Sequence, residues 1–149
     1  DISYLEDLKF ANGDPLYRQE ELSHMQDVKN VVQTALTVWY GLLGLALAIL
    51  IWFIAMSNWR QIAKALRIGS WLTVGVIAFI IVMVVINFNT LFEQFHNLFF
   101  EAGTWQFYQN DTLIRLFPLD FWRDAFVLVG VISLIIAGLI LWLIRPAKK

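Results

Sequence analysis

Two histidines, His24 and His96, are the residues of this 149-residue chain best suited to acid–base chemistry. An imidazole has an ordinary pKa of about 6.5, so it accepts and returns a proton near neutral pH. His24 follows a polar N-terminal segment, and His96 lies between two long apolar runs. The sequence has no cysteine, which excludes disulfides, thiolate metal ligands and a cysteine nucleophile.

The residues around His24 predict the start of a helix. Ser23-His-Met-Gln26 has the S-x-x-Q form of a capping box, in which the serine hydroxyl accepts from the Gln26 amide. A helix that begins near His24 would hold the ring at its positive end, which favours the neutral imidazole and its use as a base. Asp27 and Glu21, each three residues away, are candidates to orient the ring.

The residues around His96 predict an amphipathic helix that lies along a membrane surface. Apolar and polar side chains fall on separate arcs of this helix, with His96 at the border between them. The apolar arc holds Leu91, Phe92, Phe95, Leu98 and Phe99, and the polar arc holds Glu93, Gln94, Asn97 and Glu101. Glu93, three residues before His96, is a candidate to orient its ring. His96 is then either an interfacial anchor or a functional group.

The composition predicts an integral membrane protein, since 59% of the residues are hydrophobic and 15% are charged. Three uncharged runs, at about 31–57, 70–89 and 125–144, are long enough to cross the hydrocarbon core of about 30 Å. No ionisable residue lies inside them, which argues against transporters, pumps and voltage sensors. We therefore predict an all-α fold, a polytopic transmembrane helix bundle with a small extracytoplasmic cap.

The charged residues predict which side of the membrane each segment faces. Residues 58–69 and the C-terminal tail contain bases and no acid, so both should be cytoplasmic. These bases are Arg60, Lys64 and Arg67 in the first segment and Arg145, Lys148 and Lys149 in the second. Residues 1–30 and 90–124 carry all twelve carboxylates and only five of the eleven bases, so both histidines should face outward.

The same topology predicts the domain organisation. Residues 1–30 would form an extracytoplasmic part of the cap, and residues 31–149 the membrane bundle, with the extracytoplasmic interfacial segment 90–124 between its last two spans. Nothing in residues 1–30 would carry that segment across the membrane. We therefore expect a preceding N-terminal transmembrane helix that is missing from this chain.

Two other interpretations compete with a catalytic histidine pair. A zinc-dependent membrane hydrolase would need a third ligand, such as Glu93, Glu101 or Asp27, and the chain has no H-E-x-x-H motif. A non-catalytic membrane protein that binds a partner is the other. Serine-hydrolase and nucleotide-binding motifs are missing, and no basic surface for nucleic acid exists beyond two short clusters. We expect no metal and no cofactor.

Four strings in the segments that are predicted to face outward carry a family resemblance. They are Ser23-His-Met-Gln-Asp-Val28, Phe95-His-Asn-Leu-Phe-Phe100, Gly103-Thr-Trp105 and Phe117-Pro-x-x-Phe-Trp122. With them the chain resembles, over nearly its whole length, the lipoprotein intramolecular transacylase family of Gram-positive bacteria. The resemblance implies an acyltransferase of the bacterial cell membrane with four transmembrane helices and an extracellular cap, and His24 and His96 match the family's two catalytic histidines.

The resemblance also implies the substrate, a diacylglyceryl lipoprotein. Its sn-2 acyl chain would move to the α-amine of its own N-terminal cysteine, giving the lyso-form lipoprotein. An aromatic enclosure could fold the substrate so that amine and ester meet. The candidates for this substrate-binding role are Phe92, Phe95, Phe99, Phe100, Trp105 and Trp122, each of which could also serve only in packing. The expected partners are the lipoprotein, membrane lipids and the missing N-terminal part.

Overall fold

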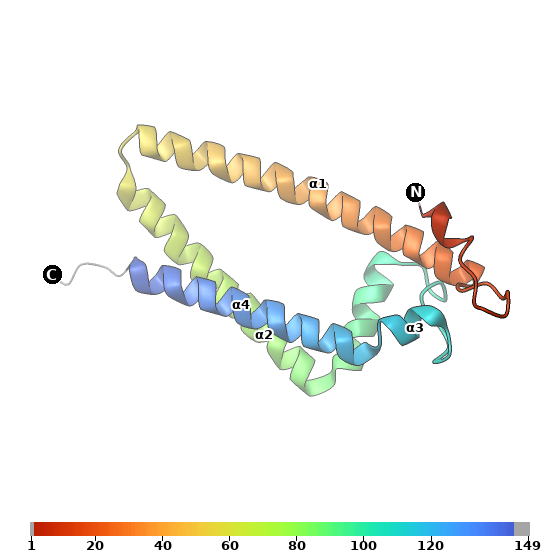
Figure 1. Ribbon diagram of the computed structural model, residues 1–149. Coiled ribbons are helices and arrows are strands. Elements are labelled where there is room, and N and C mark those ends of the chain that lie inside the picture. The colour runs from red at the N-terminus through yellow and green to blue at the C-terminus, as the bar shows by residue number, and fades with distance from the viewer. Residues whose placement is uncertain (1, 145–149) are drawn as a thin grey trace. The chain divides into compact units, whose positions relative to one another are not determined.

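The structure, a computed structural model, describes residues 2–144, and its regular elements there are helices. They are the short 3₁₀ helix η1 (Ser3–Leu5) and the α-helices α1 (Gln19–Ala55), α2 (Trp59–Phe99), α3 (Thr112–Leu116) and α4 (Leu119–Leu143) (Figure 1). The predicted all-α class is therefore confirmed. Asp1 and the tail bases Arg145, Lys148 and Lys149 lie outside the described residues.

Three of these helices, α1, α2 and α4, are long and apolar enough to cross a membrane. The uncharged runs predicted as spans lie within these helices, except that two of the runs extend one or two residues past a helix end. α1 has 37 residues, which corresponds to about 55 Å of helix and exceeds the hydrocarbon thickness. Large apolar side chains such as Ile51, Trp52 and Leu139 are exposed on these helices, a surface suited to lipid. The protein is thus a polytopic α-helical membrane protein.

The start of α1 corrects the sequence prediction. The helix begins at Gln19, five residues before His24. The acid of the first turn that caps it is Glu21, whose Oε2 accepts a hydrogen bond from the Arg18 backbone N–H at 2.8 Å. In a capping box, a glutamate in the first turn accepts from the backbone N–H of the residue just before the helix, which here is Arg18. His24 consequently lies in the second turn, where the effect of the helix dipole has largely faded.

The residues that were expected to form the cap have other roles. Ser23 is exposed within the helix. Gln26 Nε2 donates to Asn30 Oδ1 at 3.0 Å, one turn further along α1. The predicted Ser23–Gln26 capping box is therefore wrong, because the chain enters the helix before it reaches these residues.

α2 is interrupted at Asn87, where φ is −162° and ψ is 90°. The extended backbone at this residue breaks the i to i−4 hydrogen-bond ladder, which is one of the recognised causes of a kink. The helix then continues to Phe99, so the segment around His96 is helical as predicted. The interruption falls near the end of the uncharged run at 70–89, before the segment that carries His96.

The described part of the chain divides into two compact units. Unit 1 comprises the residues up to Trp39 together with Asn89–Trp122, and unit 2 comprises Tyr40–Phe88 together with the residues from Arg123 onward. Both histidines belong to unit 1. Residues 1–30 and nearly all of 90–124, which were predicted to share one side of the membrane, thus fall in the same unit.

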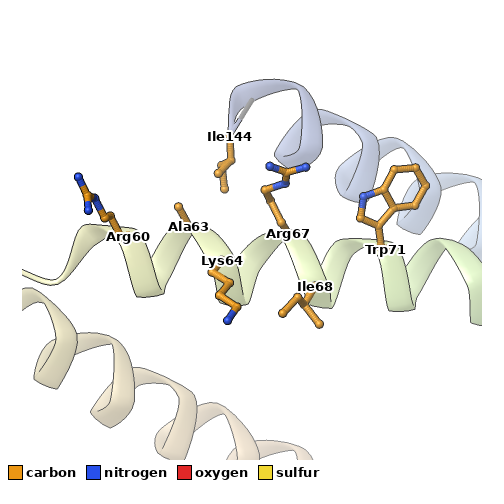
Figure 2. A pocket seen from close by; sticks show the side chains of 7 residues that line it. All are labelled: Arg60, Ala63, Lys64, Arg67, Ile68, Trp71 and Ile144. Atoms are coloured by element: carbon orange, nitrogen blue, oxygen red, sulfur yellow. The ribbon is translucent and has the colours of Figure 1, made fainter. Parts of the chain in front are cut away.

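Unit 2 is built on the contact between α2 and α4. Gly130 and Ala137 of α4 are buried, and small residues of this kind let two helices approach closely. Phe88 and Phe126 pack edge to face with their ring centroids 5.8 Å apart. The charged end of this unit contains an open hollow of about 780 Å³. Figure 2 shows Arg67 and Trp71 projecting from α2 toward the end of α4, where Ile144 lies.

Candidate active site

His24 of α1 and His96 of α2 lie next to each other in unit 1. Their ring centroids are 6.1 Å apart, and the ring planes are inclined by 26°. One atom that makes a hydrogen bond to each ring can join two nitrogens that are about 5.6 Å apart. The spacing of the two rings is therefore suited to contact with a single headgroup. The structure therefore brings together the two side chains that the sequence singles out for acid–base chemistry.

The His96 ring is oriented by its own helix. Its Nδ1 lies 2.8 Å from the carbonyl oxygen of Phe92, and because a carbonyl only accepts, Nδ1 carries the hydrogen in this contact. The neutral ring then presents a lone pair on Nε2. The Phe92 ring lies 4.0 Å from the imidazole, centroid to centroid, and holds it further. The ring of His96 is thus fixed in the tautomer that can accept a proton at Nε2.

His24 is buried, with 6% of its surface exposed. Phe100 packs edge-on against its ring at 4.9 Å, and Phe107 lies at 5.4 Å. Its Nδ1 is fully buried and has no hydrogen-bond partner within residues 2–144. This nitrogen is therefore shielded from water and unoccupied by any side chain or backbone group of that range.

The surroundings lower the pKa of both histidines below 6.5. Burial is the main cause for His24, the charge of His96 adds to it, and Asp27 acts in the opposite direction. Burial also lowers the pKa of His96, against the hydrogen bond to the Phe92 carbonyl, which raises it. Both rings are therefore neutral at pH 7, and a proton on one opposes a proton on the other. Burial, and not the helix dipole on which the sequence prediction relied, therefore favours the neutral form of His24.

Four of the six predicted aromatic residues touch a histidine. Trp105 lies 4.8 Å from His96, Phe100 5.6 Å and Phe95 5.8 Å, measured between ring centroids. Phe92, described above, is the fourth. These rings line the histidine pair with apolar surface.

Phe99 and Trp122 are not in contact with either histidine. Phe99 packs on Phe95 at 4.9 Å. Trp122 packs with Phe117 at 6.1 Å and with Phe121 at 5.3 Å, in a separate aromatic cluster. Phe107, which the sequence analysis missed, takes a place beside His24. The one signal for it is the alternation of Trp105 and Phe107 in an otherwise polar stretch.

The loop of residues 100–111 connects α2 to α3 and supplies Phe100, Trp105 and Phe107. Gly103 has a φ of 88°, a left-handed conformation that glycine adopts without the steric cost of a side chain. Thr104 Oγ1 donates to the Glu101 carbonyl oxygen at 2.8 Å and stabilises the same turn. The loop therefore turns at the position that brings Trp105 back onto His96.

The α1–α3 junction, formed by Arg18, Glu21, Asp111 and Leu113, closes this loop. Glu21, with 1% of its surface exposed, accepts a second hydrogen bond at Oε1 from the Leu113 backbone N–H at 2.7 Å. Arg18 donates to Asp111 Oδ2 at 2.7 Å, and the same oxygen accepts from the Tyr108 backbone N–H at 2.8 Å. Local sequence patterns did not reveal this junction, because its partners are more than 90 residues apart.

The two candidate orienting acids do not hold the rings by hydrogen bonds. Asp27 reaches His24 only through its charge. Glu93 is exposed on α2 and is not among the groups that shift the pKa of His96. Among residues 2–144 no three histidine, cysteine or acidic side chains come together as a metal-binding group. A zinc site with three protein ligands would therefore need a ligand from outside residues 2–144.

The hollows of about 780 and 340 Å³ both belong to unit 2, and neither is lined by a histidine. The two hollows therefore do not coincide with the histidines, which are the residues suited to acid–base chemistry. The larger hollow contains bases and apolar groups but no group that exchanges protons near neutral pH, so the histidine pair is the candidate active site.

The fold and the site define a polytopic membrane protein with a pair of neighbouring histidines, one buried and one half-buried, lined by aromatic rings. The chain belongs to the lipoprotein intramolecular transacylase family, since the sequence profile described as "Lipoprotein intramolecular transacylase Lit" matches residues 2–122. It is also similar to a protein of Aquifex aeolicus (strain VF5) that is described only as uncharacterized, with 29% identity over 143 residues. The match covers 95% of this chain and 62% of that protein. No solved structure matches.

Proposed function

We propose that the protein is an acyltransferase that moves the sn-2 acyl chain of a diacylglyceryl lipoprotein to the α-amine of the lipoprotein's own N-terminal cysteine. The family supplies the reaction. The observation that carries the proposal is the pair of neutral rings, 6.1 Å apart, which is a group able to move one proton between an amine and an ester oxygen. The product is a lyso-form lipoprotein.

His96 is the base in this mechanism. The amine lone pair attacks the ester carbonyl carbon, the new C–N bond forms, and the nitrogen loses a proton to Nε2 of His96. The hydrogen bond from Nδ1 to the Phe92 carbonyl supports this assignment, because it leaves Nε2 as the acceptor. The dipole argument for His24 as the base no longer applies, since α1 begins at Gln19.

His24 completes the proton path. The bond between the carbonyl carbon and the glyceryl oxygen breaks, and that oxygen receives the proton, directly from His96 or through His24. The reaction consumes and releases no net proton, so a pair that holds one proton at a time is sufficient. The effect of the His96 charge on the pKa of His24 favours such single occupancy. The mechanism needs no enzyme nucleophile, metal or cofactor.

The aromatic residues Phe92, Phe95, Phe100 and Trp105 hold the substrate so that amine and ester meet. Orienting two reacting groups can contribute roughly 7 to 11 kcal/mol to catalysis. Phe99 acts through Phe95, and Trp122 would bind an acyl chain away from the histidines. Asp27 raises the proton affinity of His24 by its charge, and Glu93 has at most an indirect part.

Unit 1 would face the extracytoplasmic side. The acids of residues 1–30 and 90–124 and the bases of residues 58–69 support this orientation through the positive-inside rule. Residues 31–57, 70–89 and 125–144 would cross the membrane, and residues 90–124 would lie at its outer surface. The diacylglyceryl group then enters from the outer leaflet, with membrane lipids around the site.

The test is mass spectrometry of a lipoprotein from cells that express the protein at its full natural length. His24→Ala and His96→Ala should each abolish the N-acyl lyso product while the protein still accumulates in the membrane. Gln26→Ala, which removes an exposed hydrogen bond two residues along α1 from His24, serves as the active control. Product formation by both histidine variants would overturn the proposal, and loss of wild-type activity to a chelator would assign the chemistry to a metal.

A further inference from the structure

Two buried side-chain nitrogens of the described residues lack a hydrogen-bond partner, and both belong to the histidine enclosure. They are His24 Nδ1 and Trp105 Nε1. Buried polar groups in folded proteins are nearly always paired, and the exceptions often have a role at a functional site. Their occurrence together indicates a ligand that supplies the missing partners.

The Trp105 nitrogen restricts what that ligand presents. An indole N–H donates a hydrogen bond and never accepts one, and it does not titrate. It therefore requires an acceptor, and it takes no part in moving the proton. Of the atoms that react in acyl transfer, the amine must lose a proton and the glyceryl oxygen must gain one. The carbonyl oxygen alone gains negative charge without gaining a proton.

We propose that Trp105 Nε1–H donates to the carbonyl oxygen of the sn-2 ester and stabilises the oxyanion that forms when the amine attacks. This inference rests on the proposed function and adds a third catalytic group to the histidine pair. It divides the work, since the histidines transfer the proton and a group without a relevant pKa binds the charge. Preorganised donors aimed at a developing oxyanion are among the largest contributions to enzymatic rates.

The packing around Trp105 holds its indole ring beside His96. The indole lies 4.8 Å from the His96 ring at an angle of 39°, and 6.5 Å from the Phe92 ring at 72°. Both of these rings belong to the last part of α2, which the Nδ1 contact of His96 with Phe92 already orders. The donor is therefore adjacent to the proposed base, where the carbonyl carbon under attack would lie.

A simple packing role makes a different prediction. If Trp105 only filled space, an isostere without the N–H would serve equally well, and substrate binding would not change the environment of the indole hydrogen. Replacement of the N–H by sulfur, in benzothienylalanine, keeps the size and shape of the ring and removes the donor. This substitution therefore separates the two roles.

The experiment measures single-substrate kinetics of the full-length protein in lipid nanodiscs with a synthetic diacylglyceryl lipopeptide. Benzothienylalanine at position 105 should lower kcat by about 10² to 10³ fold, the loss typical of one oxyanion donor, and leave KM within a few fold. The same replacement of Trp52, which is exposed on α1, should leave kcat unchanged. Equal kcat for wild type and the position 105 isostere would overturn the proposal.

A second measurement distinguishes failure of this inference from failure of the proposed function. The probe is the same lipopeptide with an acetylated N-terminus, which presents the ester but cannot react. Its binding should shift the Trp105 indole N–H resonance of ¹⁵N-labelled protein downfield. An active wild-type enzyme without this shift removes the Trp105 role alone. An inactive wild type that shows the shift removes the transacylase reaction and retains the contact.

Discussion

Replacement of Glu21 tests whether a buried carboxylate holds the aromatic loop over His24. Glu21 precedes His24 by one turn of α1, and its two oxygens accept from the backbone N–H groups of Arg18 and Leu113 at 2.8 and 2.7 Å. These two bonds tie the start of α1 to α3. The loop between α2 and α3 carries Phe100 and Phe107, which cover His24. Loss of the carboxylate should therefore free the loop and uncover the histidine.

The magnitude follows from the number of bonds and from burial. A hydrogen bond to a charged group contributes about 1.5 to 3 kcal/mol, and Glu21→Ala removes two of them from a site with 1% exposure. The expected loss is about 3 to 6 kcal/mol. Glu21→Gln keeps one carbonyl oxygen and turns an NH₂ group toward the other backbone N–H. Its cost should be about half as large, from the loss of one bond.

The assay is equilibrium unfolding of the full-length protein in detergent, with hydrogen exchange of the peptide that contains residues 107–116. Exchange at Leu113 should accelerate in both Glu21 variants. Glu20→Ala and Glu20→Gln are matched controls, because Glu20 is the neighbouring acid of the same first turn, is exposed, and shares the dipole interaction. Equal destabilisation by the Glu20 and Glu21 substitutions would refute the reasoning, as would unchanged exchange at Leu113.

The remaining predictions concern the charge of the histidines. NMR titration of the rings should give midpoints below pH 6.5 for both histidines. His96→Ala should raise the pKa of His24, because the substitution removes a like charge and loosens the packing. An unchanged His24 midpoint in this variant would contradict the prediction. Since the unfolded chain binds these protons first, the free energy of unfolding should fall as the pH drops below 6.5. Asp27→Asn should lower the pKa of His24 further, because the Asp27 charge raises it, and a titration that matches wild type would show that this charge is screened.

The membrane helices were predictable because their signal is local. An uncharged apolar run of twenty or more residues has few alternatives to a transmembrane helix, whatever surrounds it. The start of α1 was not predictable in the same way. Ser23 and Gln26 match a capping box, yet Glu21 decides the helix start. Glu21 is fixed by Leu113, and no pattern in residues 1–30 indicates that contact.

The packed face of the helix around His96 shows the same limit. The hydrophobic arc groups Leu98 with Phe92 and Phe95, yet Leu98 is 75% exposed. His96 and Phe100, spaced four residues apart, both contact His24 of α1, and Phe92, four residues before His96, packs on the His96 ring. Side chains on an interfacial helix can face lipid as well as protein, and hydrophobicity alone does not distinguish the two. Phe107 was missed because the fold of its loop depends on the distant α1–α3 junction.

The lowered pKa of both histidines raises the question of how a weakened base removes a proton from an amine with an ordinary pKa near 8. Direct deprotonation of the ammonium ion by such an imidazole would be unfavourable. Attack by the neutral amine changes the balance, because the nitrogen becomes far more acidic once it has bonded to the carbonyl carbon. A neutral imidazole of low pKa is then a sufficient base, and the imidazolium that results is a stronger acid toward the glyceryl oxygen. In the proposed mechanism, burial of the two rings would therefore weaken the first proton transfer, where little strength is needed, and strengthen the second, which expels the leaving group.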